Sequence, residues 1–399
     1  MGIEMKYYKA VAGNDCLKCG FCKYFVQCPM EKEKNCIGCG TCLKGCPAGD
    51  RSLKHNLETR TLYGIVVDGN QYFVPARISV RDALELVGKR SSHMHHCNSG
   101  GCFTCEVMVN GNLMRSCLTP VNENMVIFTN QETLQKQPPL RLVSFFPNYF
   151  HASLSVFTHG CNFSCGFCHN WNITFSSSGR SVTSIEAVQM ARHILASKTD
   201  PRVGISGGEP TLNRRWLIDF IRELRKLYSN IRIQLDTNAS LLTNDYIDEL
   251  YDAGLTDISP DLKGDDLSTF MKLTGIKEKN LANRYLETAW EGVKYLVNNY
   301  HDRINLAVAI PYHPSFISRQ EIERMGKRLA NMDNKIDVNL IIYQPVFRMR
   351  SVSEVSDTDI DEALELLKDA GLQKVWCQEG DDIPRGVSPE DLLLLEDGS

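Results

Sequence analysis

The sequence predicts an α/β fold in which a partial (β/α)6 barrel follows two small cysteine-rich modules. From residue 152 onward, short apolar strands alternate with helical segments, which is the order of βα units. Before that point, most of the sixteen cysteines stand close together in groups. These two observations divide the chain into modules at 1–58 and 59–135, a linker at 136–150 and the barrel at 151–399.

Length, charge and hydropathy restrict the function. The chain has 399 residues, 43% of them hydrophobic, and a net charge of −4, so it can bury the cores of several domains. A nucleic-acid-binding face needs a cationic excess, which this composition lacks. No signal-peptide pattern and no run of about 18 apolar residues occurs, so we expect a cytoplasmic protein without a membrane segment. We expect its cysteines to stay reduced and to bind metal.

The first cysteine group consists of two successive runs that each end in Cys-Pro. Its members are Cys16, Cys19, Cys22, Cys28, Cys36, Cys39, Cys42 and Cys46. The second run is C-x2-C-x2-C-x3-C-P, the bacterial ferredoxin spacing, in which the fourth cysteine often binds the other cluster. Eight thiolates suffice for two 4Fe-4S clusters. Zinc is a less favoured alternative because it has no use for a third close cysteine, and which cysteines share a cluster stays open.

The second group is Cys97, Cys102, Cys105 and Cys117, whose spacing is that of plant-type 2Fe-2S proteins. Alternating segments at 61–67 and 71–76, a helix at 80–87 and a hairpin across Asn110-Gly111 predict a β-grasp ferredoxin domain. Residues 97–121 resemble the 2Fe-2S domain of the succinate dehydrogenase iron–sulfur subunit. Histidine can replace cysteine on one iron, but four thiolates already suffice. We therefore expect the preceding histidines to lie in a solvated loop: His93, His95 and His96.

The third group is Cys161, Cys165 and Cys168, a C-x3-C-x2-C run with Phe167 before its last cysteine. Three thiolates leave one iron of a 4Fe-4S cluster without a protein ligand, and catalytic metal sites need such an open position. The run resembles the signature of radical S-adenosylmethionine (SAM) enzymes. We therefore expect three 4Fe-4S clusters, one 2Fe-2S cluster and SAM as cofactors.

Six barrel strands are predicted, at 153–158, 202–206, 231–235, 257–259, 304–310 and 338–343. A helix between the first two begins with the capping box of Thr183 and Glu186. Its predicted buried face consists of Ile185, Val188, Ala191 and Leu195.

Active sites of βα barrels lie where the strands end. Four predicted strands are followed by polar or glycine-rich sequence, and the candidate ligand residues there are Gly207, Gly208, Glu209, Asp236, Asn238 and Lys263. Each could be an ordinary turn, cap or surface charge. Their placement after successive strands favours a binding site for the amino, carboxylate and ribose groups of SAM.

These stretches resemble the pyruvate formate-lyase activating enzyme family. The shared segments are 158–171, 206–210, 235–238 and 261–263. The resemblance implies that Phe167 stacks near the SAM adenine, that residues 207–209 contact the methionine amino group and that Asp236 and Asn238 face the ribose. It also implies a monovalent cation near Asp236, Thr237 and Asp261, although Ser259-Pro260 departs from the family. His169 and Trp171 are expected to be supporting residues, and Cys377 a buried, inert thiol.

The resemblance implies a mechanism in which one electron cleaves SAM to methionine and a 5′-deoxyadenosyl radical that abstracts hydrogen. A low-potential donor such as ferredoxin or flavodoxin is the expected partner, and the N-terminal clusters would relay its electrons. The substrate stays open between a glycyl-radical enzyme and another peptide, RNA or cofactor precursor. A third alternative is an electron-transfer subunit with a degenerate barrel.

Overall fold

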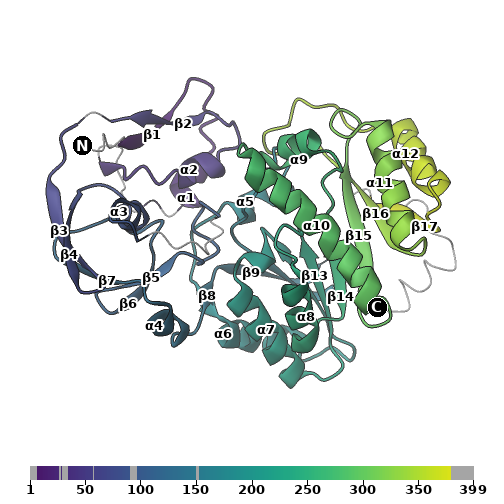
Figure 1. The fold of residues 1–399 in the computed structure, drawn as a ribbon, viewed down its shortest axis with the longest axis horizontal. Helices are drawn as coiled ribbons and strands as arrows, with labels where there is room; N and C mark the ends of the chain where they lie inside the picture. Colours follow the sequence, from purple (N-terminus) through teal and green to yellow (C-terminus); the bar gives the residue numbers. More distant parts are fainter. Residues whose placement is uncertain are drawn as a thin grey trace.

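The computed structural model describes residues 7–26, 28, 35–56, 58–89, 97–149 and 152–378. The three histidines at 93, 95 and 96 lie outside these ranges. Figure 1 shows the two N-terminal modules beside the large C-terminal sheet and its helices. None of the described helices is long and apolar enough to cross a membrane.

The first module is a small two-fold repeat built around the first eight cysteines. Antiparallel strands β1 and β2 join its ends, and each cysteine run leads into one short helix. The elements are β1 (Tyr8–Ala12), α1 (Phe21–Tyr24), α2 (Thr41–Lys44) and β2 (Arg51–His55). Gly20 and Gly40 precede α1 and α2 with φ of 77° and 75°, a conformation that favours glycine. The shared Cys-Gly-x-Cys sequence therefore folds the same way twice.

The second module is a five-stranded sheet in the order β4-β3-β7-β5-β6, crossed by one helix. The elements are β3 (Leu62–Val67), β4 (Asn70–Pro75), α3 (Val80–Leu86), β5 (Glu106–Val109), β6 (Asn112–Arg115) and β7 (Met125–Phe128). Helix α3 begins with a capping box of Ser79 and Asp82. Its buried Val80 packs with Ile65 and Ile127 in a separate core. Hairpin, helix, cysteine loop and second hairpin follow the order that the sequence predicts.

The large sheet contains eight strands in the order β17-β16-β15-β14-β13-β12-β10-β9. They are β9 (Val143–Tyr149), β10 (Ala152–Thr158), β12 (Arg202–Gly207), β13 (Arg232–Thr237), β14 (Asp257–Pro260), β15 (Asn305–Tyr312), β16 (Asp337–Ile342) and β17 (Lys374–Gln378). All neighbours from β10 to β17 are parallel. The predicted strand count of six is therefore too low by one parallel strand. Strand β17 contains the apolar run with Cys377, whose side chain is fully buried as expected.

The expected linker at 136–150 differs from the structure. It contains β8 (Leu140–Arg141), which pairs with β11 (Val182–Thr183), and β9, which pairs antiparallel with β10. Pro147 of this segment lies within a strand at the sheet edge, where proline is tolerated. The second module is thus joined to the sheet by structured backbone.

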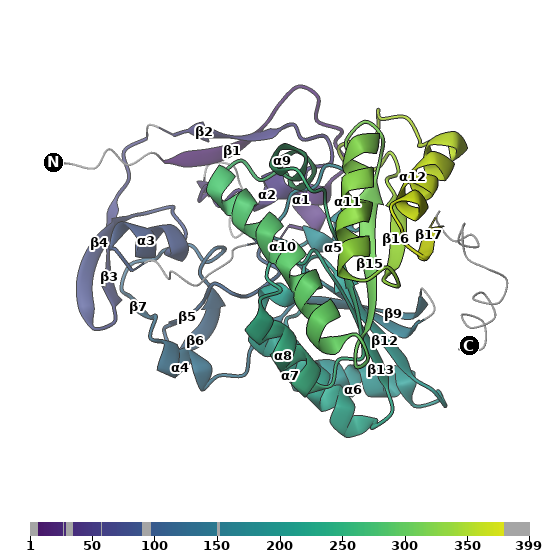
Figure 2. The same ribbon diagram turned by 45° about the vertical axis from the view of Figure 1, so that its right-hand side comes forward.

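Nine further α-helices and one 3-10 helix of the described residues accompany the strands given above; Figure 2 shows α6, α7, α8, α10 and α11 lying over the parallel strands. They are α4 (Gln131–Gln135), α5 (Trp171–Thr174), α6 (Ser184–Leu195), η2 (Pro210–Leu212), α7 (Arg214–Leu227), α8 (Asn244–Ala253), α9 (Leu267–Thr274), α10 (Lys279–Tyr300), α11 (Arg319–Met332) and α12 (Asp357–Asp369). The capping box of α6 is present.

The predicted buried face of α6 is wrong at one residue. Ile185 is 55% exposed, whereas Ala187, Val188, Ala191 and Leu195 are buried. At about 100° per residue, Ile185 lies roughly 60° beyond the edge of the stripe that these residues form.

Candidate functional site

The loop that follows β10 carries the three-cysteine run. The thiol of Cys161 accepts a hydrogen bond from the Phe163 amide at 3.3 Å, and that of Cys168 lies 3.9 Å from the Thr174 hydroxyl. Burial raises the pKa of all three thiols. Each side chain keeps some exposure. Three thiols on one loop, without a fourth cysteine beside them in the described part of this loop, fit a cluster with one open iron.

The Gly207-Gly208 turn lies directly against this loop. A side chain at Gly208 would place its Cβ 2.3 Å from the Gly160 carbonyl oxygen, and one at Gly207 would come within 2.5 Å of the Thr158 amide. The amides of Gly208 and Glu209 donate to the carbonyl oxygens of Thr158 and Gly160. Glycine is therefore required at both positions because the ends of β10 and β12 approach closely there. This close approach holds the cysteine loop against β12.

Glu209 is fully buried at the end of β12 and is the centre of a hydrogen-bond network. Its Oε1 accepts from the Thr211 hydroxyl at 2.6 Å and from the Thr237 hydroxyl at 2.7 Å. Its Oε2 accepts from the Asn238 amide at 2.7 Å. Burial raises the pKa of this carboxyl, and the hydrogen bonds from Thr211 and Thr237 lower it, with burial the larger effect. The network joins the ends of β12 and β13.

Arg141 lies beneath this network and was not predicted from the sequence. Its fully buried guanidinium donates to the carbonyl oxygens of Glu209 and Pro210, each at 2.5 Å. Burial lowers its pKa, and among the charged groups Cys102 and Glu209 raise it most. No sequence pattern marks Arg141, because its acceptors are backbone atoms almost 70 residues away, which sequence spacing does not reveal.

Side chains at the end of β13 and directly after β14 form a charged and polar group beside the cysteines. Lys263 is buried, and its ammonium lies 2.8 Å from the Asp261 carboxylate. Lys263 lowers and Asp261 raises the pKa of Cys165, so both lie near that thiol. Asp236 is close to Asp261, and burial raises its pKa to about 6. Asn238 completes the group by donating to the Cys161 thiol at 3.6 Å.

Phe167 is buried against two aromatic rings. Its ring centroid lies 3.4 Å from that of Tyr343 and 5.3 Å from that of Phe316. The buried Tyr343 hydroxyl has no hydrogen-bond partner among the described residues, and Cys165, Asp261 and Cys168 act on it electrostatically. A ligand in this region would meet an unsatisfied donor. Tyr343 follows β16, so the strand-end rule that selected Asp236 could also have found it.

Two other expected supporting residues lie at the edge of the site. His169 is exposed and accepts a hydrogen bond from the Gln344 amide at 3.4 Å. Trp171 stacks on Phe347 at 5.2 Å and meets Phe21 of the first module at 5.1 Å. Trp171 is thus part of an aromatic contact between modules.

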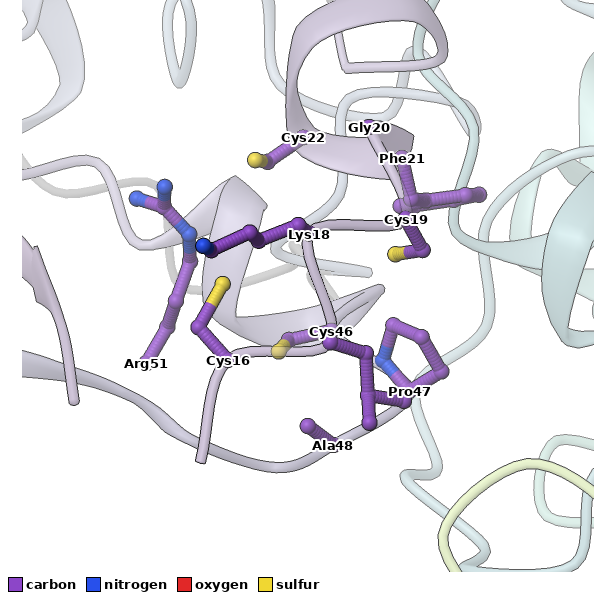
Figure 3. A pocket seen from close by; sticks show the side chains of 11 residues that line it. Cys16, Lys18, Cys19, Gly20, Phe21, Cys22, Cys46, Pro47, Ala48 and Arg51 are labelled. Atoms are coloured by element: carbon purple, nitrogen blue, oxygen red, sulfur yellow. The ribbon is translucent and has the colours of Figure 1, made fainter. Parts of the chain in front are cut away.

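The first cysteine run shares a cavity with a residue of the second run. Cys16, Cys19, Cys22 and Cys46 line a space of about 180 Å³ that Arg51 borders. Figure 3 shows their four sulfur atoms around this common space. Donors spread around a cavity of this size fit a four-iron cluster better than one zinc ion, whose thiolates would stand about 2.3 Å from the metal.

The remaining thiols of the first module form a second set. Cys28 and Cys36 act electrostatically on Cys39, and Cys39 and Cys36 act on Cys42. Arg51 lies between the two sets, since Cys22, Cys42 and Cys46 all act on its guanidinium. The fourth cysteine of each run is therefore placed with the first three of the other.

The four cysteines of the second module are buried and arranged in two pairs. The thiols of Cys97 and Cys102 are hydrogen-bonded, which lowers the pKa of Cys97. Cys105 is hydrogen-bonded in the same way to Cys117, and its pKa is lowered to about 7. Two pairs of adjacent thiols suit the two irons of a 2Fe-2S cluster, each of which takes two protein ligands.

Both N-terminal modules touch the three-cysteine loop. A Cβ at Gly160 would lie 2.8 Å from the Cys102 amide nitrogen and 3.1 Å from the Cys97 sulfur. From the first module, Lys44 donates to the Ser164 hydroxyl at 2.7 Å and the Phe163 carbonyl at 3.2 Å. Cys39 of the first module packs in turn beside buried cysteines of the second, Cys105 and Cys117. The sequence favoured docking of the modules on the barrel but did not predict which residues make either contact.

Comparisons with known sequences agree with this architecture. Residues 155–325 match the profile of the radical SAM superfamily, and residues 63–132 match the 2Fe-2S iron-sulfur cluster binding domain. A probable GTP 3′,8-cyclase of Metallosphaera sedula is 40% identical over 224 residues, 49% of this chain and 68% of that protein. The enzyme of the same name from Sulfurisphaera tokodaii is 27% identical over 220 residues, with the same coverage.

The fold and its three-cysteine loop define an iron–sulfur enzyme of the α/β class. The chain belongs to the radical SAM superfamily. Its relatives carry the name GTP 3′,8-cyclase, so the finer resemblance to the pyruvate formate-lyase activating enzymes is not confirmed. Among solved structures, HydG, a maturase of the [FeFe]-hydrogenase, superposes with a TM-score of 0.42 and 13% identity, covering 55% of this chain and 50% of its own. That likeness carries no functional information.

Proposed function

We propose that this enzyme cleaves SAM reductively at the Cys161–Cys168 loop and that its two N-terminal modules deliver the electrons. The observation that carries the proposal is that both modules contact the same short loop. The Cys102 backbone lies against Gly160, and Lys44 is hydrogen-bonded to Ser164. Electron transfer requires close approach of donor and acceptor, and these contacts support it.

The thiols divide into sets that suit three 4Fe-4S clusters and one 2Fe-2S cluster. Cys161, Cys165 and Cys168 would hold the catalytic cluster, which supplies the electron for cleavage of the sulfonium bond and generation of a 5′-deoxyadenosyl radical. The other sets are Cys16, Cys19, Cys22 and Cys46; Cys28, Cys36, Cys39 and Cys42; and Cys97, Cys102, Cys105 and Cys117.

The residues at the strand ends would hold SAM. Among the described residues, Glu209 Oε2 accepts a hydrogen bond from the Asn238 amide alone, so this oxygen can accept another from the methionine ammonium. Lys263, held by Asp261, is a cation for the carboxylate. Asp236 and Asn238 would face the ribose, and Phe167 with Tyr343 the adenine.

Contacts between the sets suggest the order of the relay. Cys19 of the first set and Cys28 of the second are both exposed, but only the second set is described as packing beside the 2Fe-2S thiols, so the first set would accept electrons from a low-potential donor protein such as a ferredoxin or flavodoxin. The second set, on the other side of Arg51, would receive the electrons next. Its Cys39 packs beside Cys105 and Cys117, so the electrons would then pass to the buried 2Fe-2S set. Gly160, against Cys97, connects that set to the catalytic loop.

The relatives favour a purine nucleotide as the substrate over a glycyl-radical protein, because those aligned with this chain are named GTP 3′,8-cyclases. Incubation of the reduced enzyme with SAM and GTP, followed by mass spectrometry, tests this choice. Loss of GTP together with a stoichiometric new nucleotide supports it. Unchanged GTP beside steady SAM cleavage rejects GTP and leaves a protein, RNA or other precursor.

Reductive cleavage itself is tested with Cys165→Ala and dithionite as the reductant. The variant is expected to form no 5′-deoxyadenosine, because its loop retains too few thiolates for the catalytic cluster. The 2Fe-2S optical and paramagnetic signals should remain, since the two sets share no residue. SAM cleavage at the wild-type rate in this variant would show that the catalytic cluster lies elsewhere.

A further inference from the structure

Lys44 is the one described residue of the first module whose side chain enters the catalytic loop as a hydrogen-bond donor. It is the last residue of α2, two positions after Cys42 and two before Cys46. Its ammonium donates to Ser164 Oγ at 2.7 Å and to the carbonyl oxygen of Phe163 at 3.2 Å. Both acceptors stand between Cys161 and Cys165, so Lys44 is held within the catalytic loop.

The charges around this ammonium belong to two different cysteine sets. Burial lowers the pKa of Lys44, and Arg348 lowers it further, whereas the thiols of Cys161, Cys97 and Cys165 favour the charged form. None of the carboxylates that the structure describes is among its strongest partners. Lys44 is thus a cation whose attractive neighbours are cysteines of the catalytic and 2Fe-2S sets.

We propose that Lys44 is a positioning residue that keeps the first module on the catalytic loop and raises the reduction potential of the catalytic cluster. A reduced cluster carries one more negative charge than an oxidised one. A fixed cation in partly desolvated surroundings therefore favours the reduced form. The electron that the catalytic cluster gains is the one that the relay loses, and no proton or further reductant is needed. This inference rests on the proposed relay and names a residue that tunes its last step.

Three substitutions separate charge from packing. Lys44→Met removes the charge and the hydrogen bonds, Lys44→Gln removes the charge but keeps a donor for Ser164, and Lys44→Arg keeps the charge. Lys54→Met is the matched control, because Lys54 is an exposed lysine on β2 of the same module. Each full-length protein is reconstituted anaerobically, and its iron content is determined before the measurement.

The measurement is a redox titration followed by electron paramagnetic resonance. The catalytic signal is identified as the one that changes shape when SAM is added. Lys44→Met and Lys44→Gln are expected to decrease the ratio of reduced to oxidised catalytic cluster about tenfold at a fixed potential, equal to about 59 mV for one electron. Lys44→Arg and Lys54→Met should stay within about twofold of the wild type.

A catalytic potential that is unchanged in both Lys44→Met and Lys44→Gln, with full iron content, overturns the proposal. If Lys44→Met fails to assemble its clusters, Lys44→Arg and Lys44→Gln still test the proposal. The proposal requires a higher reduction potential of the catalytic cluster in Lys44→Arg than in Lys44→Gln. Dithionite-driven SAM cleavage by the wild type is measured in the same preparation. If the wild type cleaves SAM and the potential is unchanged in the variants, the role of Lys44 is rejected while reductive cleavage stands. If the wild type does not cleave SAM, the proposed function is rejected.

Discussion

Arg348 donates a hydrogen bond of 2.6 Å to the carbonyl oxygen of Leu43, 305 positions earlier in the sequence. Its guanidinium also donates to the carbonyl oxygens of Lys44 and Cys46. One side chain from the segment after β16 therefore caps the end of α2, where free carbonyl groups concentrate. The residue that caps a helix of the first cluster module belongs to the catalytic unit.

Arg348→Ala should loosen α2. Hydrogen bonds from charged donors contribute about 1.5 to 3 kcal/mol, so we expect amide hydrogen exchange at 41–46 to accelerate at least about tenfold. Hydrogen–deuterium exchange followed by mass spectrometry measures this. Arg348→Lys should not restore protection, because one ammonium cannot reproduce the fork of donors. The exposed neighbour Arg350→Ala is the control, and equal exchange in it and in Arg348→Ala would contradict the capping role.

Anaerobic reconstitution should yield about fourteen irons per chain, from three 4Fe-4S clusters and one 2Fe-2S cluster. The expectation follows from thiol sets of four, four, four and three. Iron and zinc are measured by elemental analysis of the same sample. A result near six irons with tightly bound zinc would show that the first module holds structural zinc instead.

Cys102→Ser should slow turnover that depends on a protein electron donor at least about tenfold, while dithionite-driven SAM cleavage stays within about twofold of the wild type. The reason is that Cys102 belongs to the set that lies against Gly160, and dithionite can reduce the catalytic cluster directly. The two rates of 5′-deoxyadenosine formation are compared in one preparation. Equal loss, or no loss, with both reductants would assign the second module a structural role.

Glu209→Gln should weaken SAM binding by about one to two orders of magnitude, because the charge-assisted bond to the methionine ammonium contributes about 1.5 to 3 kcal/mol. The substitution also turns an acceptor into an amide donor among the donors Thr211, Thr237 and Asn238. Calorimetry with SAM and iron analysis are run together. Glu186→Gln makes the same change at an exposed helix cap and should bind SAM normally. Unchanged affinity in Glu209→Gln with full iron would show that Glu209 only supports the strand ends.

Asp236→Asn should stabilise the protein at high pH and not at low pH. The folded pKa of about 6 lies above the value of about 3.9 that an unfolded Asp shows, so wild-type stability from this group is complete below pH ~4 and is lost as pH rises through 6. Asparagine does not ionise. Thermal unfolding of both proteins at pH 4 and pH 8 measures the difference, with the exposed Asp369→Asn as control. An equal shift in melting temperature at both pH values would contradict the assigned titration.

Local spacing in the sequence determined which thiols could share a site and where the strands lie. The C-x3-C-x2-C run, the capping box of Thr183 and Glu186 and the alternation of strands and helices depend on neighbours a few residues apart. The α/β class and the parallel sheet are therefore confirmed. Ile185 was placed wrongly because the pattern identifies apolar residues but does not show which part of the stripe meets the sheet.

Only the tertiary structure decided how the parts meet. Cys46 joins the first run because the backbone repeat brings two loops together, and sequence spacing allowed other pairings. Lys44 and Arg348 meet partners 119 to 305 positions away, and Arg141 bonds to backbone carbonyls that any sequence would supply. The Gly207-Gly208 turn also admits the backbone of Thr158 and Gly160, a close approach that the sequence did not predict. Such contacts depend on chain reversal over long distances, and no periodicity or spacing in the sequence records them.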